Sequence, residues 1–401
     1  MKKEAEVYFL YICTNIFIIE LIQIWINLMH TRITEREVLK RKLEAQVNIH
    51  MPAPRRIGKT WTINRLAEDL RKADWLVVEL DVQGMSCPER FAHRLCQKIQ
   101  GQIPQATGLW TGFKQRMENL VVGDWSGNPL DALSRMAPIP FLEALIEVLS
   151  KEHKRSAIFV DEIAFFVLAF ADKDPTGAKE FFYQLRGIQL ANPSVRWLFT
   201  GSIGLDVVAE RFRLGGAFVD LERFILEPFT EDEARSFLRD ETTQVAFNHR
   251  FRASDEDFDY IFGELGWLAP YYLKLVGNEV RPSGSQEDGV LTATRDDFKV
   301  AIDRLLEPSR KADFAVWKEH VDKNLPQPDR EIARKLLSKL SQGADGETLD
   351  TLIANFHPEK ARQVRTVLDI LRNDGLVQKV AERYCFRSGL IRRYWKEYEA
   401  Q

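Results

Sequence analysis

The sequence has few residues of the kinds that build disulfide or zinc frameworks. Its four cysteines, Cys13, Cys87, Cys96 and Cys385, show no paired metal-ligand spacing, and its seven histidines form no HExxH motif. A zinc site is therefore not expected, and the scattered thiols indicate a reducing, cytoplasmic compartment. The formal net charge is only −3, so the chain as a whole has no field that would attract nucleic acid or an acidic membrane.

Long hydrophobic runs are also rare, and the most conspicuous one stands at the N-terminus. The segment Val7–Met29 is nearly continuously apolar, about the length that a membrane-spanning helix requires. Glu20 interrupts it near the middle, where a carboxylate costs a few kcal/mol in a bilayer. Residues 1–30 are open to three interpretations: a membrane anchor, a helix packed on the protein or a partner, or an extension preceding a start at Met29. No small-residue cleavage site follows, so a cleavable signal peptide is not expected.

The most informative segment is Val47–Thr60, a strand pattern that runs into a loop and then into the helix pattern Trp61–Lys72. Successive backbone N–H groups at a helix N-terminus form an anion site. Gly58 lets the backbone approach a phosphate, Lys59 reaches the β- and γ-phosphates, and the Thr60 hydroxyl can ligate Mg²⁺. The segment therefore predicts a site for ATP and Mg²⁺. The predicted nucleotide-binding residues of this loop are Ala53, Pro54, Arg55, Arg56, Ile57, Gly58, Lys59, Thr60 and Trp61.

The loop departs from the usual phosphate-binding pattern at its first position. Ala53 stands there in place of glycine, and alanine resists a positive φ. This departure leaves nucleotide binding expected and places efficient hydrolysis in question. The alternative interpretation is a basic turn ahead of an ordinary helix, so the prediction needs support from another part of the chain.

Support comes from Arg155–Glu162, an apolar run that ends in two carboxylates. Such a run is typical of a strand buried on both faces of a parallel sheet, and ligands of these sheets bind beyond the carboxyl ends of the strands. We therefore expect Asp161 to hold Mg²⁺ together with Thr60, and Glu162 to act as the general base for water. Lys59 and Glu162 are the predicted catalytic residues. The alternative is an ordinary acidic turn after a strand.

Further strand and helix patterns alternate along the first half of the chain. Val195–Ser202 is a strand pattern that ends in hydroxyl residues, and Thr200 or Ser202 is predicted to contact the γ-phosphate or the attacking water. The other predicted strands are Trp75–Asp81 and Phe224–Leu226, and the helices between them are Glu89–Gln100, Pro140–Lys151 and Gly177–Gln189. The alternation predicts an α/β fold, a P-loop parallel sheet with helices on both faces. Ile103–Pro138 has weak periodicity and is predicted to be an insertion at the sheet edge.

Taken together, these motifs resemble those of the archaeal-type ATPase family, P-loop proteins of the AAA+/STAND group. The matching motifs are Pro54–Thr60, Phe159–Glu162 and Phe199–Ser202. Three later segments look like the family's entry to the lid, its lid motif and the end of its winged helix: Leu226–Ala234, Gly266–Tyr272 and Tyr384–Trp395. The resemblance spans roughly Thr31 to Tyr398. It implies ATP binding and hydrolysis at Lys59, Thr60, Asp161 and Glu162.

After Thr230 the patterns become helical and predict a lid that covers the nucleotide and moves during its cycle. The predicted lid helices are Glu231–Arg239, Asp255–Leu265, Tyr271–Val280 and Thr294–Leu306. Arg281–Asp288 is predicted to be a polar loop, and Lys323–Asp329 a linker. Arg186, Arg211 and Arg213 are candidates for an arginine that reaches the γ-phosphate from the lid or from a neighbouring subunit.

The last segment predicts a winged-helix domain. Its expected elements are helices Arg330–Leu340, Glu347–Asn355 and Glu359–Asp374, a C-cap at Gly375, and a hairpin of Leu376–Val380 with Arg383–Phe386. This architecture binds duplex DNA in many proteins and serves only for packing or protein contacts in others. Residues 358–387 are the predicted DNA-binding segment. The basic residues expected to neutralise phosphates are Lys360, Arg362, Arg365, Lys379 and Arg383.

The predicted organisation has an apolar segment at 1–30, an ATPase core at 31–229, a helical lid at 230–322 and a winged helix at 330–401. Two classes of function stay open. The first is a Mg-dependent ATP hydrolase of the AAA+/STAND type that couples its nucleotide state to the winged helix. The second is a nucleotide-gated regulator that binds DNA or protein with little turnover. A protein partner or a homo-oligomer fits either class, and membrane association through 7–29 stays an alternative to a purely cytoplasmic location.

Overall fold

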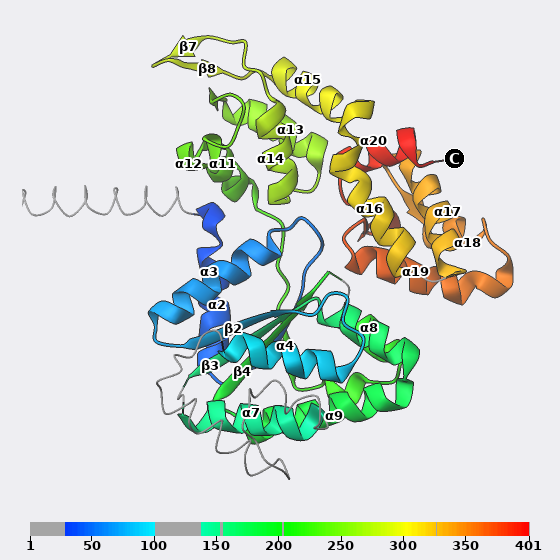
Figure 1. Cartoon of the computed structure of the whole chain (residues 1–401). Coiled ribbons are helices and arrows are strands. Elements are labelled where there is room, and N and C mark those ends of the chain that lie inside the picture. Colours follow the sequence, from blue (N-terminus) through cyan, green and yellow to red (C-terminus); the bar gives the residue numbers. More distant parts are fainter. Residues whose placement is uncertain (1–28, 101–137, 153–154, 203, 326, 401) are drawn as a thin grey trace, which may run out of the picture. The chain divides into compact units, whose positions relative to one another are not determined.

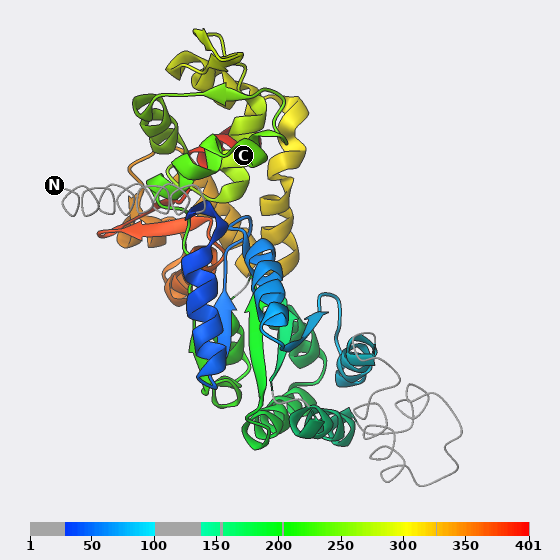
Figure 2. The ribbon, with the colours of Figure 1, turned by 90° about the vertical axis from the view of Figure 1, so that its left-hand side faces the viewer.

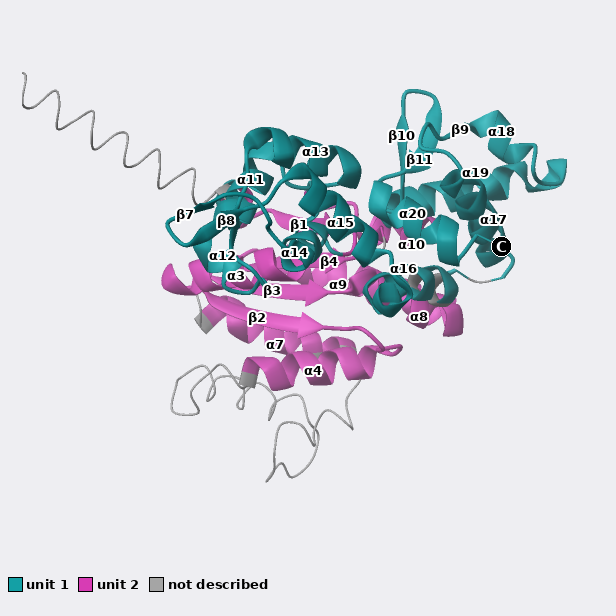
Figure 3. Cartoon of the chain, turned by 90° about the horizontal axis from the view of Figure 1, so that it is seen from above, with its two compact units in different colours: residues 1–34, 56–58, 227–401 teal, residues 35–55, 59–226 magenta. Residues whose placement is uncertain are grey.

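The computed structural model describes residues 29–100, 138–152, 155–202, 204–325 and 327–400 (Figure 1). The chain forms two compact units (Figure 3): unit 1 contains residues 1–34, 56–58 and 227–401, and unit 2 contains residues 35–55 and 59–226. The predicted apolar segment Val7–Met29 and the predicted insertion Ile103–Pro138 lie outside the described residues, apart from Met29 and Pro138. None of the described helices combines the length and apolar character that a membrane span needs.

Unit 2 is built on a parallel sheet. Within the described residues, its five strands run in the order β2-β3-β4-β1-β5, and all neighbouring pairs are parallel. The strands are β1 (Asn48–Pro52), β2 (Leu76–Asp81), β3 (Ser156–Asp161), β4 (Val195–Gly201) and β5 (Leu221–Arg223). The register pairs Asp81 with Asp161 and Pro52 with Gly201, so the carboxyl ends of β1 to β4 meet at one edge. The predicted α/β class is confirmed.

Helices cover both faces of this sheet. As a result, β4 is buried along its whole length and β3 is buried up to its last residue. One face packs into a continuous apolar core with α4 (Pro88–Gln100), α7 (Pro138–Glu152), α8 (Ile163–Lys173), α9 (Pro175–Ala191), α10 (Leu205–Arg211) and η2 (Gly215–Ala217). Stacked and edge-on contacts among Phe91, Phe166, Phe181 and Phe182 fill that core. The helices α2 (Ile33–Glu44) and α3 (Lys59–Lys72) run alongside the strands and bury their own apolar residues (Figure 2).

The fifth strand is not where the sequence placed it. The apolar run Phe224–Leu226 was the predicted strand, but β5 is the preceding segment Leu221–Arg223, which pairs with Asn48–His50 of β1. β5 is an edge strand with mostly exposed side chains, so it has no buried apolar pattern for the sequence to display. The run that follows adds one backbone contact, from Phe224 N–H to His50 O at 2.9 Å.

The central part of unit 1 is helical, as predicted for the lid. Its elements are η1 (Met29–Thr31), α11 (Glu231–Arg239), α12 (Glu241–Gln244), α13 (Asp255–Leu265), α14 (Pro270–Glu279), α15 (Arg295–Leu305), η3 (Pro308–Arg310) and α16 (Lys311–Asn324). Local sequence starts several of them: Thr230 and Thr294 form capping boxes, and the Ser254 side chain caps α13. Gly266 ends α13 at a φ of 65°.

Two predictions for this part hold only over some of their residues. The polar loop Arg281–Asp288 contributes β7 (Gln286–Glu287) to a small sheet with β6 (Phe251–Arg252) and β8 (Val290–Thr292). These strands are too short and exposed to show periodicity, and Arg252 of β6 forms ion pairs with Glu287 and Asp288 at 3.0 and 3.2 Å. The linker predicted over Lys323–Asp329 is shorter than expected, because α16 runs through Asn324 and α17 begins at Asp329.

The end of unit 1 confirms the winged-helix prediction. It contains α17 (Asp329–Ser341), β9 (Glu347–Thr348), α18 (Leu349–Ile353), η4 (Pro358–Lys360), α19 (Ala361–Asn373), β10 (Val377–Val380), β11 (Arg383–Phe386) and α20 (Gly389–Tyr398). Gly375 has the expected positive φ, 85°, after α19. The predicted helix Glu347–Asn355 is shorter, since Glu347 and Thr348 pair with Tyr384 and Arg383 as an added strand.

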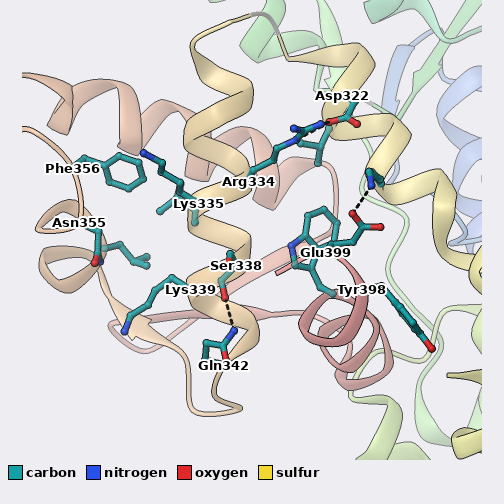
Figure 4. Close-up of a pocket in the computed structure, with 15 residues that line it drawn as sticks. Asp322, Arg334, Lys335, Ser338, Lys339, Gln342, Asn355, Phe356, Tyr398 and Glu399 are labelled. Carbon is teal, nitrogen blue, oxygen red and sulfur yellow. Dashed lines mark hydrogen bonds and ion pairs between the residues drawn. The ribbon is translucent and has the colours of Figure 1, made fainter. Parts of the chain in front are cut away.

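A cavity of about 710 Å³ lies among α16, α17, α18 and α20 of unit 1 (Figure 4). Ion pairs along it join the helices: Lys318 to Glu399 at 2.7 Å links α16 to the residue after α20, and Arg334 to Asp322 at 2.6 Å links α17 to α16. Helix α20 also approaches α13 closely, because a Cβ on Gly389 would lie 2.4 Å from Glu264 O. The lid helices and the winged helix of unit 1 are therefore in direct contact.

Candidate functional site

The loop after β1 has the backbone of a phosphate-binding turn at its end. Gly58 has a φ of 95° and Arg56 a φ of 71°, and α3 begins directly after them at Lys59. The first N–H groups of an α-helix have no partner within the helix, so the start of α3 presents donors and a positive dipole end to an anion. Gly58 therefore stands at the turn, and Lys59 and Thr60 are the first residues of α3.

Ala53 does not carry the backbone strain that its position suggested. It is not among the described residues with a positive φ. Its N–H donates to Gly201 O at 3.0 Å, and the residue is only 2 % exposed. Ala53 therefore continues the pairing of β1 with β4 and needs no glycine. The strain expected of an alanine at a positive φ is therefore absent, because the positive φ values of this loop belong to Arg56 and Gly58.

Lys59 and the two acids after β3 form one polar cluster in unit 2. Lys59 Nζ donates to Asp161 Oδ1 at 2.5 Å and to Glu162 Oε1 at 2.9 Å. The side chains are 10 %, 28 % and 13 % exposed, respectively. Residues more than a hundred positions apart thus meet at the carboxyl edge of the sheet. The ammonium offsets part of the repulsion between the two neighbouring carboxylates.

Two hydroxyl residues at the end of β4 complete this cluster. Thr200 Oγ1 donates to Asp161 Oδ1 at 2.5 Å. Ser202 donates twice to Glu162 Oε2, from its backbone N–H at 3.0 Å and from its hydroxyl at 3.1 Å. The sequence predicted these hydroxyls as contacts of a γ-phosphate or of water. In this structure they hold the two carboxylates, a role that the residue pattern did not reveal.

Glu162 is the N-cap residue of α8 in a left-handed conformation, with φ 59° and ψ 35°. A non-glycine residue in this region costs of order 1–3 kcal/mol and persists where its surroundings hold it. Here the surroundings are Lys59 and Ser202 on the side chain. In this conformation the carboxylate lies at the carboxyl edge of the sheet, within hydrogen-bond distance of Lys59 and Ser202.

The donor set suits a magnesium ion and a triphosphate. Mg²⁺ prefers oxygen ligands and is usually held by one or two carboxylates together with phosphates and water. Asp161 Oδ1 accepts bonds from Lys59, Thr200 and the Glu162 N–H, whereas its Oδ2 accepts none from the described residues. Oδ2 is therefore the oxygen of Asp161 that could ligate a cation, and the exposed Thr60 at the start of α3 could add a hydroxyl.

The remaining loop residues have distinct surroundings. Pro54 and Arg55 are half-buried, Ile57 is fully buried, and Trp61 is 41 % exposed beside Arg65. Within unit 1, the Arg56 guanidinium lies 4.0 Å from the centroid of the Tyr271 ring in α14. Arg32 Nη2, which the sequence did not single out, donates to Ile57 O at 3.4 Å and to Glu227 O at 2.8 Å. Arg32 thereby holds the loop backbone beside the entry to the lid.

Two of the candidate arginines are engaged elsewhere on unit 2. Arg186 pairs with Asp220 at 2.5 Å, which raises the pKa of its guanidinium, and Arg211 pairs with Asp172 at 3.5 Å. Arg213 has a φ of 56° at the turn after α10. None of the three contacts the Lys59 cluster by a hydrogen bond or ion pair recorded among the described residues.

Comparisons with known proteins bear on the fold. No family model matches the chain, and no curated protein matches it significantly. Among solved structures, a Walker-type ATPase of Pyrococcus abyssi aligns with a TM-score of 0.61 at 13 % identity, covering 90 % of this chain and 95 % of that one.

Two Aeropyrum pernix proteins align with lower scores. The ORC2 protein in ADPNP–ADP complexes has a TM-score of 0.41 at 11 % identity, covering 92 % of this chain and 95 % of that one. The ORC1 protein in complex with DNA has a TM-score of 0.38 at 16 % identity, covering 93 % and 96 %. The similarity to the Pyrococcus abyssi ATPase extends over nearly the whole of both chains, so the two chains share their fold.

Proposed function

We propose that the protein binds Mg·ATP on the loop Ala53–Thr60 and hydrolyses it to ADP and phosphate. The observation that carries this proposal is the joining of Lys59, Asp161 and Glu162 in one cluster beside the first turn of α3. A lysine, a metal-binding acid and a second acid at the end of a buried strand are the parts that phosphoryl transfer to water requires.

Each residue of the cluster has a separate task in this scheme. The Lys59 ammonium exchanges its carboxylate partners for the β- and γ-phosphate oxygens and offsets the charge that builds on the transferred group. Glu162 accepts a proton from the water whose oxygen forms the new bond to the γ-phosphorus, while the bond from that phosphorus to the β,γ-bridging oxygen breaks. Ser202 keeps the Glu162 carboxylate oriented. Thr60 and Asp161 would hold Mg²⁺, which would supply positive charge against the negative charge of the phosphates.

Nucleotide binding is tested by titrating a fluorescent ATP analogue against wild type and Lys59→Ala. We expect at least a tenfold loss of affinity in Lys59→Ala, since a charge-assisted contact with a phosphate is worth roughly 1.5–3 kcal/mol. Lys72→Ala is the matched control, because Lys72 lies at the other end of the same helix. Equal affinities for wild type and Lys59→Ala would refute nucleotide binding on this loop.

Hydrolysis is tested with Glu162→Gln, which keeps the size of the side chain and an acceptor oxygen for Ser202. We expect unchanged ATP affinity and a fall in kcat of about 10²–10⁴-fold, the usual contribution of a positioned base. The exposed Glu180→Gln on α9 is the control. If wild type and Glu162→Gln bind ATP equally and turn it over equally slowly, the hydrolase proposal is wrong and the nucleotide-gated regulator with little turnover is favoured.

We further propose that nucleotide state reaches the winged helix through contacts inside unit 1. Arg56 of the loop stacks on Tyr271, and Tyr271 Oη donates to Asp313 O of α16 at 3.3 Å. Helix α16 is joined to the end of α20 by the ion pair of Lys318 with Glu399. The predicted lid (230–322) and winged helix (330–401) would thus respond together when a bound nucleotide moves the loop at Arg56.

The coupling is tested by hydrogen exchange of residues 361–386 with and without ATP. In wild type we expect ATP to change the hydrogen exchange of this segment. In Tyr271→Leu this change should be lost. The ATP affinity of Tyr271→Leu should fall by less than about tenfold, which is the loss expected for Lys59→Ala. Tyr260→Leu is a matched control, because Tyr260 also stacks on an arginine, Arg295 at 4.3 Å, elsewhere among the lid helices. An identical ATP response in wild type and Tyr271→Leu would refute this path.

Duplex DNA is the partner that the exposed basic residues of α19 and η4 favour. Lys360, Arg362 and Arg365 are all exposed. The other two predicted basic residues are partly committed, since Lys379 pairs with Glu382 at 3.0 Å and the Arg383 guanidinium donates to the carbonyls of Asp345 and Gly346. The DNA proposal therefore depends on three residues.

Fluorescence anisotropy of labelled duplex DNA at several salt concentrations tests this proposal. Replacing the three residues by glutamine should abolish binding or lower the slope of log affinity against log salt by up to about 3, one unit for each lost phosphate contact. The control removes an equal charge from unit 2, at Arg90, Arg94 and Lys98 of the surface helix α4. Absence of binding by wild type, or equal loss in both triple variants, would overturn DNA binding by this segment.

A further inference from the structure

A second cavity, of about 390 Å³, lies in unit 2 at the amino ends of the strands. Its polar lining comes from the residues that precede β1 to β3 and from the start of β4: Gln46, Trp75, Arg155, Ser194 and Arg196. The loop Ala53–Thr60 follows the carboxyl end of β1, a strand of five residues that spans about 17 Å. The cavity is therefore separate from the proposed nucleotide site.

Arg196 is the central feature of this cavity. The residue is only 4 % exposed. Its Nη1 donates to Gln46 O at 2.8 Å, while its Nη2 is buried and has no hydrogen-bond partner. Burial lowers the pKa of its guanidinium, and no carboxylate of the described residues pairs with it. A buried cation without a counter-ion costs several kcal/mol, so pairing with an anion would stabilise this guanidinium.

Two further donors line the same cavity. Trp75 is 6 % exposed, and its Nε1 is buried without a hydrogen-bond partner. Arg155 is exposed and makes no ion pair with any residue that the structure describes. The indole N–H and the two guanidinium groups are all hydrogen-bond donors, and the two guanidinium groups each carry a positive charge. The acidic residue of the lining, Glu44, is exposed at the end of α2 and makes no recorded contact with Arg196.

We propose that this cavity binds a small ligand through an oxyanion, a phosphate or carboxylate group. The oxyanion would accept hydrogen bonds from Arg196 Nη2 and Trp75 Nε1 and pair with Arg155 from the open side. Guanidinium groups suit both anions because their paired N–H groups match two oxygens. The volume lies at the lower end of the range for small-molecule sites, about 300–1,000 Å³, which leaves room for an organic group attached to the anion.

The test follows the indole N–H signal of Trp75 by ¹H–¹⁵N NMR while inorganic phosphate is added at constant ionic strength. The signal is assigned by its absence in Trp75→Phe, because the chain has nine tryptophans. We expect a saturable shift of this signal in wild type, at least about tenfold weaker phosphate binding in Arg196→Met and in Arg155→Gln, and tighter binding in Glu44→Gln. Arg155 is exposed, so Arg155→Gln is informative even where Arg196→Met fails to fold.

Two controls separate this site from the loop and identify the anion. Lys59→Ala should retain the Trp75 response in full; its loss there would place the anion at the loop and overturn the proposal. An acetate titration distinguishes the sources: a response to phosphate alone indicates a phosphorylated ligand, and a response to both indicates a site that also accepts carboxylates. No saturable shift with either anion, or equal shifts in wild type and both arginine variants, would refute the site.

Discussion

The Lys59 cluster makes a prediction that does not depend on nucleotide. Replacing Lys59 by methionine keeps much of the side-chain volume and removes the charge that lies between Asp161 and Glu162. The Lys59 ammonium lies 2.5 Å from the Asp161 carboxylate and 2.9 Å from the Glu162 carboxylate. At an effective dielectric constant of about 20, the Coulomb attraction of each pair is about 6 kcal/mol before the cost of desolvation. The desolvation of the ammonium offsets most of this attraction, whereas its removal leaves two neighbouring carboxylates unpaired. Breaking a buried pair of this kind costs about 3–5 kcal/mol, and the partial exposure of Asp161 places the expected loss near the lower limit, about 3 kcal/mol.

A double-mutant cycle isolates the electrostatic part of that loss. We expect Glu162→Gln alone to cost about 1 kcal/mol, because Asp161 still pairs with Lys59 and the amide oxygen still accepts from Ser202. The combination Lys59→Met with Glu162→Gln should cost less than the sum of the single changes by about 1–2 kcal/mol, since it removes the repulsion between the carboxylates.

The assay is urea unfolding of wild type, the two single variants and the double variant at neutral pH and low ionic strength, without nucleotide. The unfolding midpoints are compared, provided that the dependence of the unfolding free energy on urea concentration is the same in all four proteins. Added salt should reduce the coupling between the two positions. Additive losses within about 0.5 kcal/mol, or a Lys59→Met variant as stable as wild type, would refute the cluster as described and with it the geometry on which the hydrolase proposal depends.

Three further predictions concern buried groups. Burial lowers the pKa of His50 to about 4, so as the pH falls the unfolded chain is protonated at this histidine before the folded chain is. About 3 kcal/mol of the folding stability that is present above pH ~6.5 is therefore lost as the pH falls to about 4. In His50→Gln the urea midpoint should depend less on pH across that range. Trp317 Nε1 donates to the fully buried Tyr272 hydroxyl at 2.5 Å, so Tyr272→Phe should cost about 1–3 kcal/mol, and a loss no larger than that of Tyr271→Phe would contradict this. Burial raises the pKa of the Cys96 thiol to about 12, so Cys96→Ser should remove one reactive thiol in urea and none from the native protein in a thiol-labelling assay.

The sequence predicted those parts of the fold in which burial and periodicity agree. β3 is apolar at almost every position because helices cover both of its faces, and the two acids at its end mark the carboxyl edge of the sheet. The cap residues Thr230 and Thr294 indicated helix starts through local hydrogen bonds. In contrast, β7 and β9 have two residues each, and a strand of that length has no measurable alternation. Their existence depends on partners that are distant in sequence.

The candidate site also has features that local sequence could predict and features that depend on tertiary structure. The places of Lys59 after a loop and of Glu162 after a strand could be predicted, because a glycine-containing turn before a helix and an apolar run that ends in acids are both visible in the sequence. The bonds from Thr200 and Ser202 to the acids could not, because they depend on the parallel pairing of β3 with β4 and on the left-handed backbone of Glu162. The cavity around Arg196 had no sequence signal at all, since its lining comes from the starts of four separate strands.

The sequence raised the question of whether alanine at position 53 strains the backbone of the loop. The non-glycine residues with positive φ in the loop and in the cluster are Arg56 and Glu162, respectively, so the backbone strain lies at these two residues and not at Ala53. Ala53 keeps its N–H paired with Gly201 and buries its Cβ. Ala53→Gly, which would restore the usual loop pattern, should therefore leave kcat within about twofold of wild type and lower stability by about 1 kcal/mol, because glycine gains freedom in the unfolded chain and loses a buried methyl. Steady-state ATPase rates and urea midpoints of both proteins measure this, and a large rise in kcat would show that the residue at position 53 restrains hydrolysis after all.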